Sequence, residues 1–174
     1  MRAIGLPKIL AFYALVAGLA AAALWRQPNA SLLQITPWGL LLGSAAGLGL
    51  VALSRLLSVH TRWGAQLADE FRVLVGPLSA PEALSLALAS GIAEEALFRG
   101  VLQPSLGLLI TSGIFAALHV GPNPRFIPWT VITFFAGLLF GALLLWTQSL
   151  WPPILAHATV NFFNLRYLSN IKIP

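Results

Sequence analysis

The chain contains 174 residues, of which 58% are hydrophobic and 9% are charged, and its mean hydropathy is +0.85. So few polar residues cannot coat a soluble globule, and the composition therefore predicts an integral membrane protein. Cysteine is absent, which excludes a disulfide framework, a thiolate nucleophile and a cysteine-ligated zinc site. The net charge of +5 is spread over the loops, which indicates control of topology and contact with lipid headgroups, not nucleic-acid binding.

Two apolar segments come first. The segment over about residues 9–24 would also suit a signal peptide, but further apolar segments follow it, which favours a retained transmembrane helix. The segment over about residues 38–57 is rich in glycine, which permits close helix packing, and Arg55 near its end can extend to the membrane interface. Residues 58–72 are the most polar stretch and predict a loop or a short interfacial helix.

The second half of the chain predicts four more helices. Ser79 and Glu82 form a capping-box pattern that begins a helix over about residues 80–103, which Pro104 is expected to end. Three further apolar segments follow, and they cover about residues 105–120, 127–146 and 151–168. The sequence therefore predicts an all-α, polytopic transmembrane bundle of about six helices that forms a single domain over residues 1–174.

Lysine and arginine are distributed unevenly between the two sides of this bundle. With the N-terminus inside, the outside loops hold only Arg26, and Arg99 belongs to a polar motif. The other basic residues fall on the inside: Arg2, Lys8, Arg55, Arg62, Arg72, Arg125, Arg166 and Lys172. Because basic residues accumulate in cytoplasmic segments, both termini are predicted to be cytoplasmic.

The first polar motif is Glu94-Glu95-x-x-x-Arg99, within an apolar helix. A charged side chain deep in a bilayer costs at least ~2.5–3.5 kcal/mol. Glu95 and Arg99 are spaced i,i+4 and can pair, whereas Glu94 points about 100° away and can face a cavity. The alternative is a structural ion pair that joins helices, but such a pair needs only one acid.

The second motif is Phe115-x-x-x-His119. The midpoint between Glu94 and His119 falls at Leu106 and Gly107. In an antiparallel hairpin that turns there, the two side chains lie at the same depth, ~18 Å from the turn. A Glu–His pair inside a membrane is suited to binding and activating a water molecule. The alternative is a histidine that serves packing or lies at the interface.

The third motif is His157-x-x-x-Asn161, which places both side chains on one helix face. Two polar side chains at this spacing can join helices through hydrogen bonds. They can also present two donors to one point, as an oxyanion site requires. Both interpretations remain open at this stage.

The three motifs together, in this order, resemble the EExxxR, FxxxH and HxxxN motifs of the CAAX protease and bacteriocin-processing family of intramembrane proteases, to which the type II CAAX prenyl endopeptidases are related. The resemblance covers about residues 87–167 and implies a catalytic core over about residues 80–168, with a polar active-site cavity within the membrane.

This resemblance implies roles for the motif residues. Glu94 would be the general base and, with His119, would polarise a water molecule for attack on a peptide carbonyl. His157 and Asn161 would stabilise the resulting oxyanion. The residue chemistry agrees, because the chain has no cysteine and no serine or threonine placed convincingly beside a base.

The resemblance also implies that Glu95 and Arg99 orient the site or help to protonate the leaving amine. No cofactor is expected, since the prenyl endopeptidase branch implies a glutamate mechanism without a metal. The less favoured alternative is a zinc ion held by Glu94, His119 and His157.

The favoured function is therefore an intramembrane endopeptidase of a bacterial or archaeal cell membrane that cleaves a membrane-associated protein or peptide. One alternative is a non-catalytic immunity or scaffold protein that binds a peptide partner. Another is a proton-coupled transporter, although the sequence shows no inverted repeat. The expected partners are membrane lipids and the protein or peptide substrate, with no nucleic acid.

Overall fold

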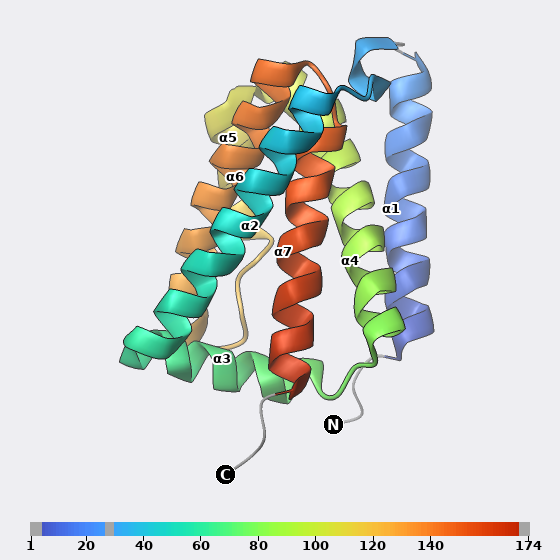
Figure 1. Cartoon of the computed structure of the whole chain (residues 1–174). Helices are drawn as coiled ribbons and strands as arrows, with labels where there is room; N and C mark the ends of the chain where they lie inside the picture. The colour runs from blue at the N-terminus through green and yellow to red at the C-terminus, as the bar shows by residue number, and fades with distance from the viewer. Residues whose placement is uncertain (1–4, 27–29, 171–174) are drawn as a thin grey trace.

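The computed structural model describes residues 5–26 and 30–170, and all regular structure in these ranges is helical (Figure 1). The predicted all-α bundle is thus confirmed. The long elements are α1 Leu6–Arg26, α2 Pro37–His60, α3 Arg62–Val75, α4 Ala80–Glu95, η2 Ala96–Leu102, α5 Gln103–Ala117, α6 Ile127–Thr147 and α7 Trp151–Asn170. Two short 3₁₀ turns complete the set, η1 Ala30–Leu33 and η3 Pro124–Phe126.

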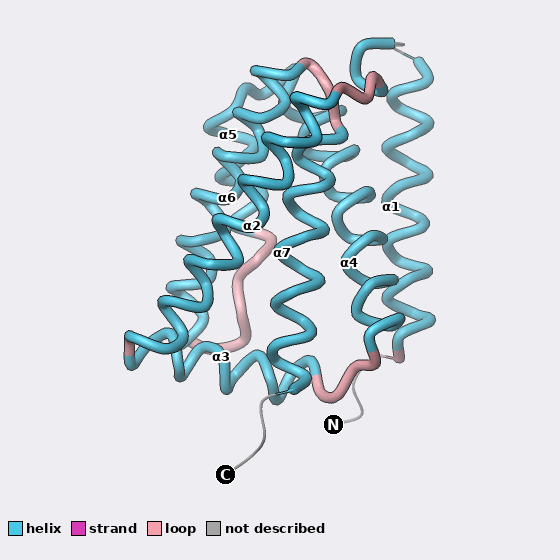
Figure 2. Tube along the Cα trace, in the orientation of Figure 1, coloured by secondary structure: helices cyan, strands magenta, loops and turns pink. Residues whose placement is uncertain are grey.

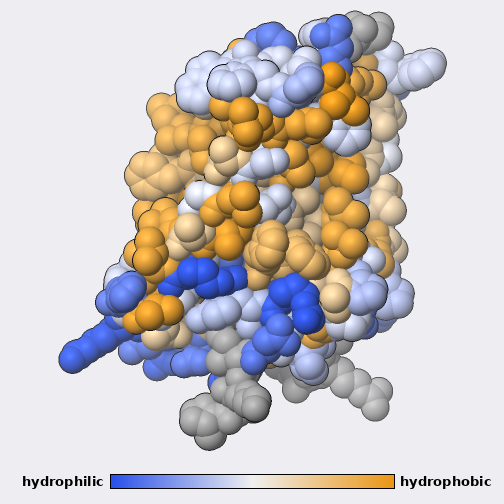
Figure 3. Space-filling model, viewed as in Figure 1, coloured by the Kyte–Doolittle hydropathy of each residue, from blue (hydrophilic) through white to orange (hydrophobic). Residues whose placement is uncertain are grey.

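The helices have the length and composition of an integral membrane protein. Among the described residues, 4 helical stretches are long and apolar enough to cross a membrane: Leu6–Arg26, Pro37–His60, Ala80–Ala117 and Pro124–Thr147. On the face drawn in Figure 3, hydrophobic side chains form a broad band between two more hydrophilic ends. An apolar band of this kind is what a bilayer covers.

The first and last helices agree with an even number of spans. α1 begins and α7 ends at the same end of the bundle, next to α3 (Figure 1). Arg2 and Lys172, which contributed to the predicted orientation, lie outside the described residues. The cytoplasmic location of this end therefore stays a prediction.

The predicted helix break at Pro104 is wrong. α4 continues through the π-helical segment η2 into α5, and Pro104 lies directly after the π-helical turns in a helix that continues past it. The chain instead reverses at Gly107, which has φ 76° and ψ 167°. Only glycine adopts this conformation without steric cost. The reversal folds the rest of α5 back against η2, in an antiparallel hairpin centred where the motif spacing predicted it.

The helix after this reversal is shorter than the apolar segment that predicted it. α5 ends at Ala117, and residues 118–123 carry the chain as a loop to η3 (the pink segment beside α7 in Figure 2). His119 therefore lies in the turn after α5 and not on the helix.

The polar stretch after α2 forms the predicted short helix. α3 lies across one end of the bundle (Figure 1), and Thr61 accepts a hydrogen bond from Gly64 to cap its start. Glu70 of α3 binds the turn before α6, with Oε1 2.6 Å from Nη1 of Arg125 and Oε2 accepting from Asn123. Hydrogen bonds from Arg125 and Asn123 hold the pKa of Glu70 below its usual range.

Glycines fix α7, which carries the third motif, against α2. A Cβ atom at Gly43 would lie 2.6 Å from the carbonyl oxygen of Pro152, and one at Gly47 would lie 2.9 Å from that of Ala156. The close packing predicted from the glycine-rich segment is thus confirmed, and it leaves α7 little freedom to shift.

Candidate active site

Glu95 occupies the last position of α4 and is completely buried. Its Oε2 atom lies 3.1 Å from Nε of Arg99, and its Oε1 atom accepts a hydrogen bond of 3.3 Å from Nη1. The predicted pair is therefore confirmed. Nδ1 of His157 also lies 2.7 Å from Oε1, a contact that the sequence did not predict. Both oxygens of Glu95 thus face positively charged or donating groups.

Arg99 is held on all sides. It lies in the seven-residue π-helical segment η2, and π-helical turns are frequent at functional sites. Its Nη2 atom donates to the carbonyl oxygen of Gly137 on α6 at 3.0 Å, and its guanidinium lies 4.5 Å from the ring centroid of Phe115. Since Arg99 has no exposed surface, its position is set by these contacts.

Glu94 points to the other side of α4, as predicted. Its Oε2 atom lies 3.5 Å from Nε2 of His119 and 3.9 Å from Nε2 of His157. The same oxygen is buried and accepts no hydrogen bond from the described residues. Tyr13 of α1 lines the same cavity as the Glu94 carboxylate. The Glu94 side chain is 13% exposed, compared with 0% for Glu95.

His119 is fixed by the end of α5. Its Nδ1 atom lies 2.6 Å from the carbonyl oxygen of Phe115, which lost its helical partner when α5 ended. A carbonyl oxygen only accepts, so Nδ1 carries the hydrogen and Nε2 faces Glu94. Trp129 packs against the imidazole with a centroid distance of 5.4 Å.

His157 and Asn161 project from one face of α7. Glu95 accepts from Nδ1 of His157, whose ring is stacked on Phe140 at a centroid distance of 5.2 Å. One turn later, Nδ2 of Asn161 donates to Oγ of Ser90 on α4 at 2.9 Å. The structure thus brings the three motifs together from α4, η2, α5 and α7.

These side chains surround a cavity of about 640 Å³ inside the bundle. Four of the six candidate catalytic residues line it, namely Glu94, His119, His157 and Asn161, together with Phe115 of the second motif. Glu95 and Arg99 do not line the cavity and lie behind it. The rest of the wall is largely apolar, with contributions from α1, α2 and α6.

Several residues around the site were missed from the sequence. Trp129 and Phe140 of α6 both line the cavity although neither belongs to a motif, and Phe140 is at the same time part of the buried core. Tyr13 is the one uncharged polar side chain in an otherwise apolar stretch of α1, a signal that could have identified it. Ser90 gave no such signal, because nothing in its spacing indicates that Asn161 lies opposite.

The three residues of the zinc alternative, Glu94, His119 and His157, lie close to one another. Both imidazoles have Nδ1 bound to an acceptor and turn Nε2 toward Glu94, an arrangement that metal-binding histidines also use. Within the described ranges, however, no group of 3 or more His, Cys, Asp or Glu side chains is arranged to hold a metal ion. That Glu94, His119 and His157 act on a water molecule without a metal ion stays a prediction.

Comparison with known proteins gives two matches. The model of the family described as type II CAAX prenyl endopeptidase Rce1-like matches residues 76–163, which include all three motifs. Over 86 residues the chain is 42% identical to the uncharacterized protein YpbD of Bacillus subtilis (strain 168). That alignment covers 48% of this chain and 43% of the relative, so the chain spans less than half of the relative's length. No solved structure matches.

Proposed function

Because this chain belongs to the type II CAAX prenyl endopeptidase Rce1-like family, we propose that it is an intramembrane endopeptidase that hydrolyses a peptide bond with a water molecule activated by Glu94 and His119. Its substrate is a membrane-associated protein or peptide. The observation that carries this proposal is the Glu94 oxygen that faces two imidazole Nε2 atoms without a hydrogen bond of its own.

In this mechanism the attacking water molecule lies beside Glu94 and His119. Nε2 of neutral His119 and Oε2 of Glu94 are both acceptors, and they lie 3.5 Å apart. A water molecule beside them can donate one hydrogen to each. Glu94 removes a proton as the water oxygen forms a bond with the carbonyl carbon of the substrate.

Asn161 and His157 stabilise the negative charge that develops on the carbonyl oxygen. Nδ2 of Asn161 has two hydrogens, and only one of them is donated to Ser90. His157 donates Nδ1–H to Glu95 and faces the cavity with Nε2, through which it donates to the oxyanion when this nitrogen also carries a hydrogen. Donors positioned in a site without bulk water stabilise an oxyanion strongly.

The tetrahedral intermediate then breaks down. The C–N bond of the substrate breaks, and the proton that Glu94 took from water passes to the leaving amine. Glu94 returns to its carboxylate form, and the products are a carboxylic acid and an amine. Glu95 and Arg99 act as positioning residues, because they hold His157 and touch neither the water nor the substrate.

The zinc alternative would use the same Glu94, His119 and His157 as ligands, and the metal would supply Lewis-acid activation of the water. It leaves Asn161 without a direct role, whereas the metal-free mechanism gives a role to every motif residue. The metal-free mechanism is therefore preferred. The bacterial relative supports a location in a bacterial cell membrane.

A cleavage assay with the purified protein in detergent tests this proposal. Wild-type protein and Glu94→Ala are incubated with a library of apolar peptides, and the products are identified by mass spectrometry. The wild type is expected to cleave some of them, and Glu94→Ala is expected to lose about 10²–10⁴-fold in rate. Cleavage that persists in Glu94→Ala would exclude Glu94 as the base, and peptide binding without cleavage by the wild type would favour a binding protein.

A further inference from the structure

His119 differs from the other candidate catalytic residues in the way it is held. Of these six residues, all of which the structure describes, only His119 lies outside a helical segment. Its backbone amide donates to the carbonyl oxygen of Ala116 at 2.9 Å, and the next helical turn is η3. A loop is more mobile than the elements it connects, so contacts from other parts of the chain must fix this imidazole.

The first of these contacts comes from α6. Thr130 lies in the first turn of α6, and its Oγ1 atom donates to the carbonyl oxygen of His119 at 3.0 Å. This bond ties together the two ends of the segment over residues 119–130, which we call the histidine loop. Within it, Gly121 packs so closely on Phe126 that a Cβ atom at residue 121 would clash with the ring. The loop is therefore closed at its ends and packed in its interior.

Trp129, the neighbour of Thr130, supplies the second contact. Its indole meets the His119 imidazole edge to face, at an interplanar angle of 74°. Phe115 contacts the same imidazole at a centroid distance of 4.4 Å. Aromatic pairs of this kind favour particular relative orientations of the two rings. Rings from α5 and α6 thus hold the imidazole with Nε2 directed at Glu94.

α3 contacts both the indole and the histidine loop. Phe71 lies edge to face against Trp129 at a centroid distance of 4.8 Å and against Phe126 at 5.0 Å. Its neighbour Glu70 binds Arg125 at 2.6 Å. Two consecutive residues of α3 therefore hold the segment that carries the catalytic histidine.

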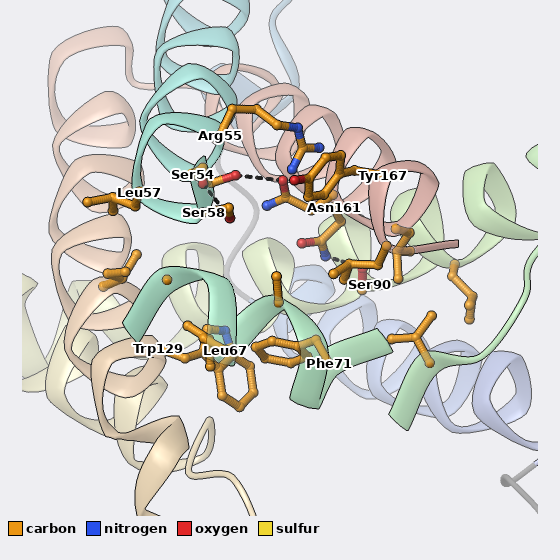
Figure 4. A pocket seen from close by; sticks show the side chains of 18 of the residues that line it. Ser54, Arg55, Leu57, Ser58, Leu67, Phe71, Ser90, Trp129, Asn161 and Tyr167 are labelled. Carbon is orange, nitrogen blue, oxygen red and sulfur yellow. Dashed lines mark hydrogen bonds between the residues drawn. The ribbon is translucent and has the colours of Figure 1, made fainter. Parts of the chain in front are cut away.

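Phe71 and Trp129 also line a second cavity, which has a volume of about 360 Å³ and lies between α2, α3 and α7, beside Arg55 (Figure 4). Trp129 lines the catalytic cavity as well, whereas Phe71 does not. Thr130 lines neither cavity. Substitutions of Phe71 and Thr130 can therefore change the position of His119 without changing a side chain in the wall of the catalytic cavity.

We propose that Thr130 and Phe71 are positioning residues for His119. Thr130 fixes the backbone of the turn, and Phe71 fixes Trp129 against the imidazole. α3 is then part of the machinery that holds the catalytic histidine, and not only a helix across the end of the bundle. The expected effect on cleavage rests on the proposed function, whereas the state of His119 can be measured without cleavage.

The first test is kinetic and begins with the hydroxyl group of Thr130. Thr130→Val removes the donor and keeps the shape of the side chain, and Thr130→Ser keeps the donor. Thr130→Val should lower kcat about two- to tenfold with KM unchanged, the usual effect of one hydrogen bond, and Thr130→Ser should restore most of it. Thr147→Val is the matched control, because Thr147 donates to Leu143 at the other end of α6.

Phe71→Leu tests the contribution of α3. It keeps an apolar side chain and removes the edge-to-face contact with Trp129. We expect kcat to fall about two- to tenfold, as for loss of an aromatic pair. Val73→Ala, on the exposed face of α3, should behave as the wild type.

The second test observes His119 directly. The chain contains 3 histidines, so protein labelled with ¹⁵N only at histidine gives few imidazole signals in a magnetic-resonance spectrum, and His119→Gln identifies that of His119. The Nδ1–H bond to the end of α5 predicts a single tautomer in the wild type. Thr130→Val and Phe71→Leu should each move this signal toward a mixture of both tautomers and leave that of His157 in place.

An unchanged His119 signal in both variants, or a raised KM with normal kcat, would overturn the proposal. Displacement of the His157 signal together with that of His119 would also overturn it, because the substitutions would then disturb the whole bundle. If the wild-type protein cleaves no peptide, the proposed function fails, and the histidine signals still decide whether Thr130 and Phe71 position His119.

Discussion

Glu94 and Glu95 are adjacent in the sequence, yet their surroundings differ in almost every respect. Glu95 has no exposed surface and contacts Arg99 and His157 through both oxygens. Glu94 is partly exposed to a large cavity, and its Oε2 atom accepts no hydrogen bond from the described residues. Oε2 of Glu95 also accepts no hydrogen bond, but it lies 3.1 Å from Nε of Arg99, whose positive charge compensates it. No arginine or lysine among the described residues pairs with Glu94, which faces the cavity.

This difference separates the stability of the site from its chemistry. A buried ion pair with additional hydrogen bonds fixes geometry, because neither partner can leave without stranding the other. An acceptor without a partner costs free energy in the folded state, and it is retained where it serves a ligand or a reaction. We therefore expect substitution of Glu95 to lower mainly the stability of the protein, and substitution of Glu94 to lower mainly its activity.

The largest expected effect on stability is that of Glu95→Ala. Removing this carboxylate leaves the Arg99 guanidinium buried without its counter-ion, which costs about 3–5 kcal/mol. Glu94→Ala should change the free energy of unfolding by less than about 1 kcal/mol, although it removes activity. Unfolding of both variants in mixed detergent micelles, followed by circular dichroism, measures the difference. Equal losses of stability would mean that the two carboxylates do not have separate tasks.

Asn161→Ala tests the proposed oxyanion donor, and its expected loss of activity is smaller than that of Glu94→Ala. Loss of one oxyanion donor typically lowers kcat by about 10²–10³. KM should change little, because the interaction is made in the transition state. Ser90 keeps its bond to the carbonyl oxygen of Ala87, so the variant should remain folded. Steady-state kinetics measures kcat and KM of Asn161→Ala, and Asn170→Ala, at the exposed end of the same helix, is the control. A raised KM with normal kcat would make Asn161 a binding residue.

Arg99→Lys tests whether the buried pair of Glu95 and Arg99 needs the planar guanidinium as well as its positive charge. Arginine reaches both oxygens of Glu95 and the carbonyl oxygen of Gly137, whereas a lysine ammonium lacks the planar fork. Loss of a hydrogen bond to a charged group costs about 1.5–3 kcal/mol, and His157 should be held less firmly. Stability and kcat/KM should both fall, whereas Arg62→Lys should change neither. Wild-type values for Arg99→Lys would show that charge alone suffices.

Much of this arrangement could be read from the sequence, because apolar segment length and residue spacing are local properties. The Glu95–Arg99 pair and the common depth of Glu94 and His119 followed from helix geometry alone. Pro104 misled because the helix continues past this proline, directly after the π-helical segment, and Gly107 supplied the reversal instead.

Contacts between distant segments were harder to predict. The hydrogen bond between Glu95 and His157 joins residues 62 positions apart, and the one between Ser90 and Asn161 joins residues 71 apart. Neither follows from periodicity, since each depends on how α7 is placed against α4. The cavity beside Arg55 depends in the same way on α2, α3 and α7 together.

The smallest expected effect is that of removing metal ions, and it decides how Glu94 works. A catalytic zinc site needs three protein ligands and one open position, which Glu94, His119 and His157 could supply. In that case the two imidazoles would hold the metal, and Asn161 would have no direct role. In the metal-free mechanism, His119 holds the water molecule and His157 donates to the oxyanion.

Activity should therefore be unchanged after exhaustive treatment with a strong zinc chelator in detergent, followed by removal of the chelator. Unfolding should also be unaffected, because Glu95, Arg99 and His157 bind one another without a metal. If activity is lost and added zinc restores it, His119 and His157 are metal ligands. Glu94 would then be a metal ligand as well, and Glu95 would be the group that orients the ligand His157.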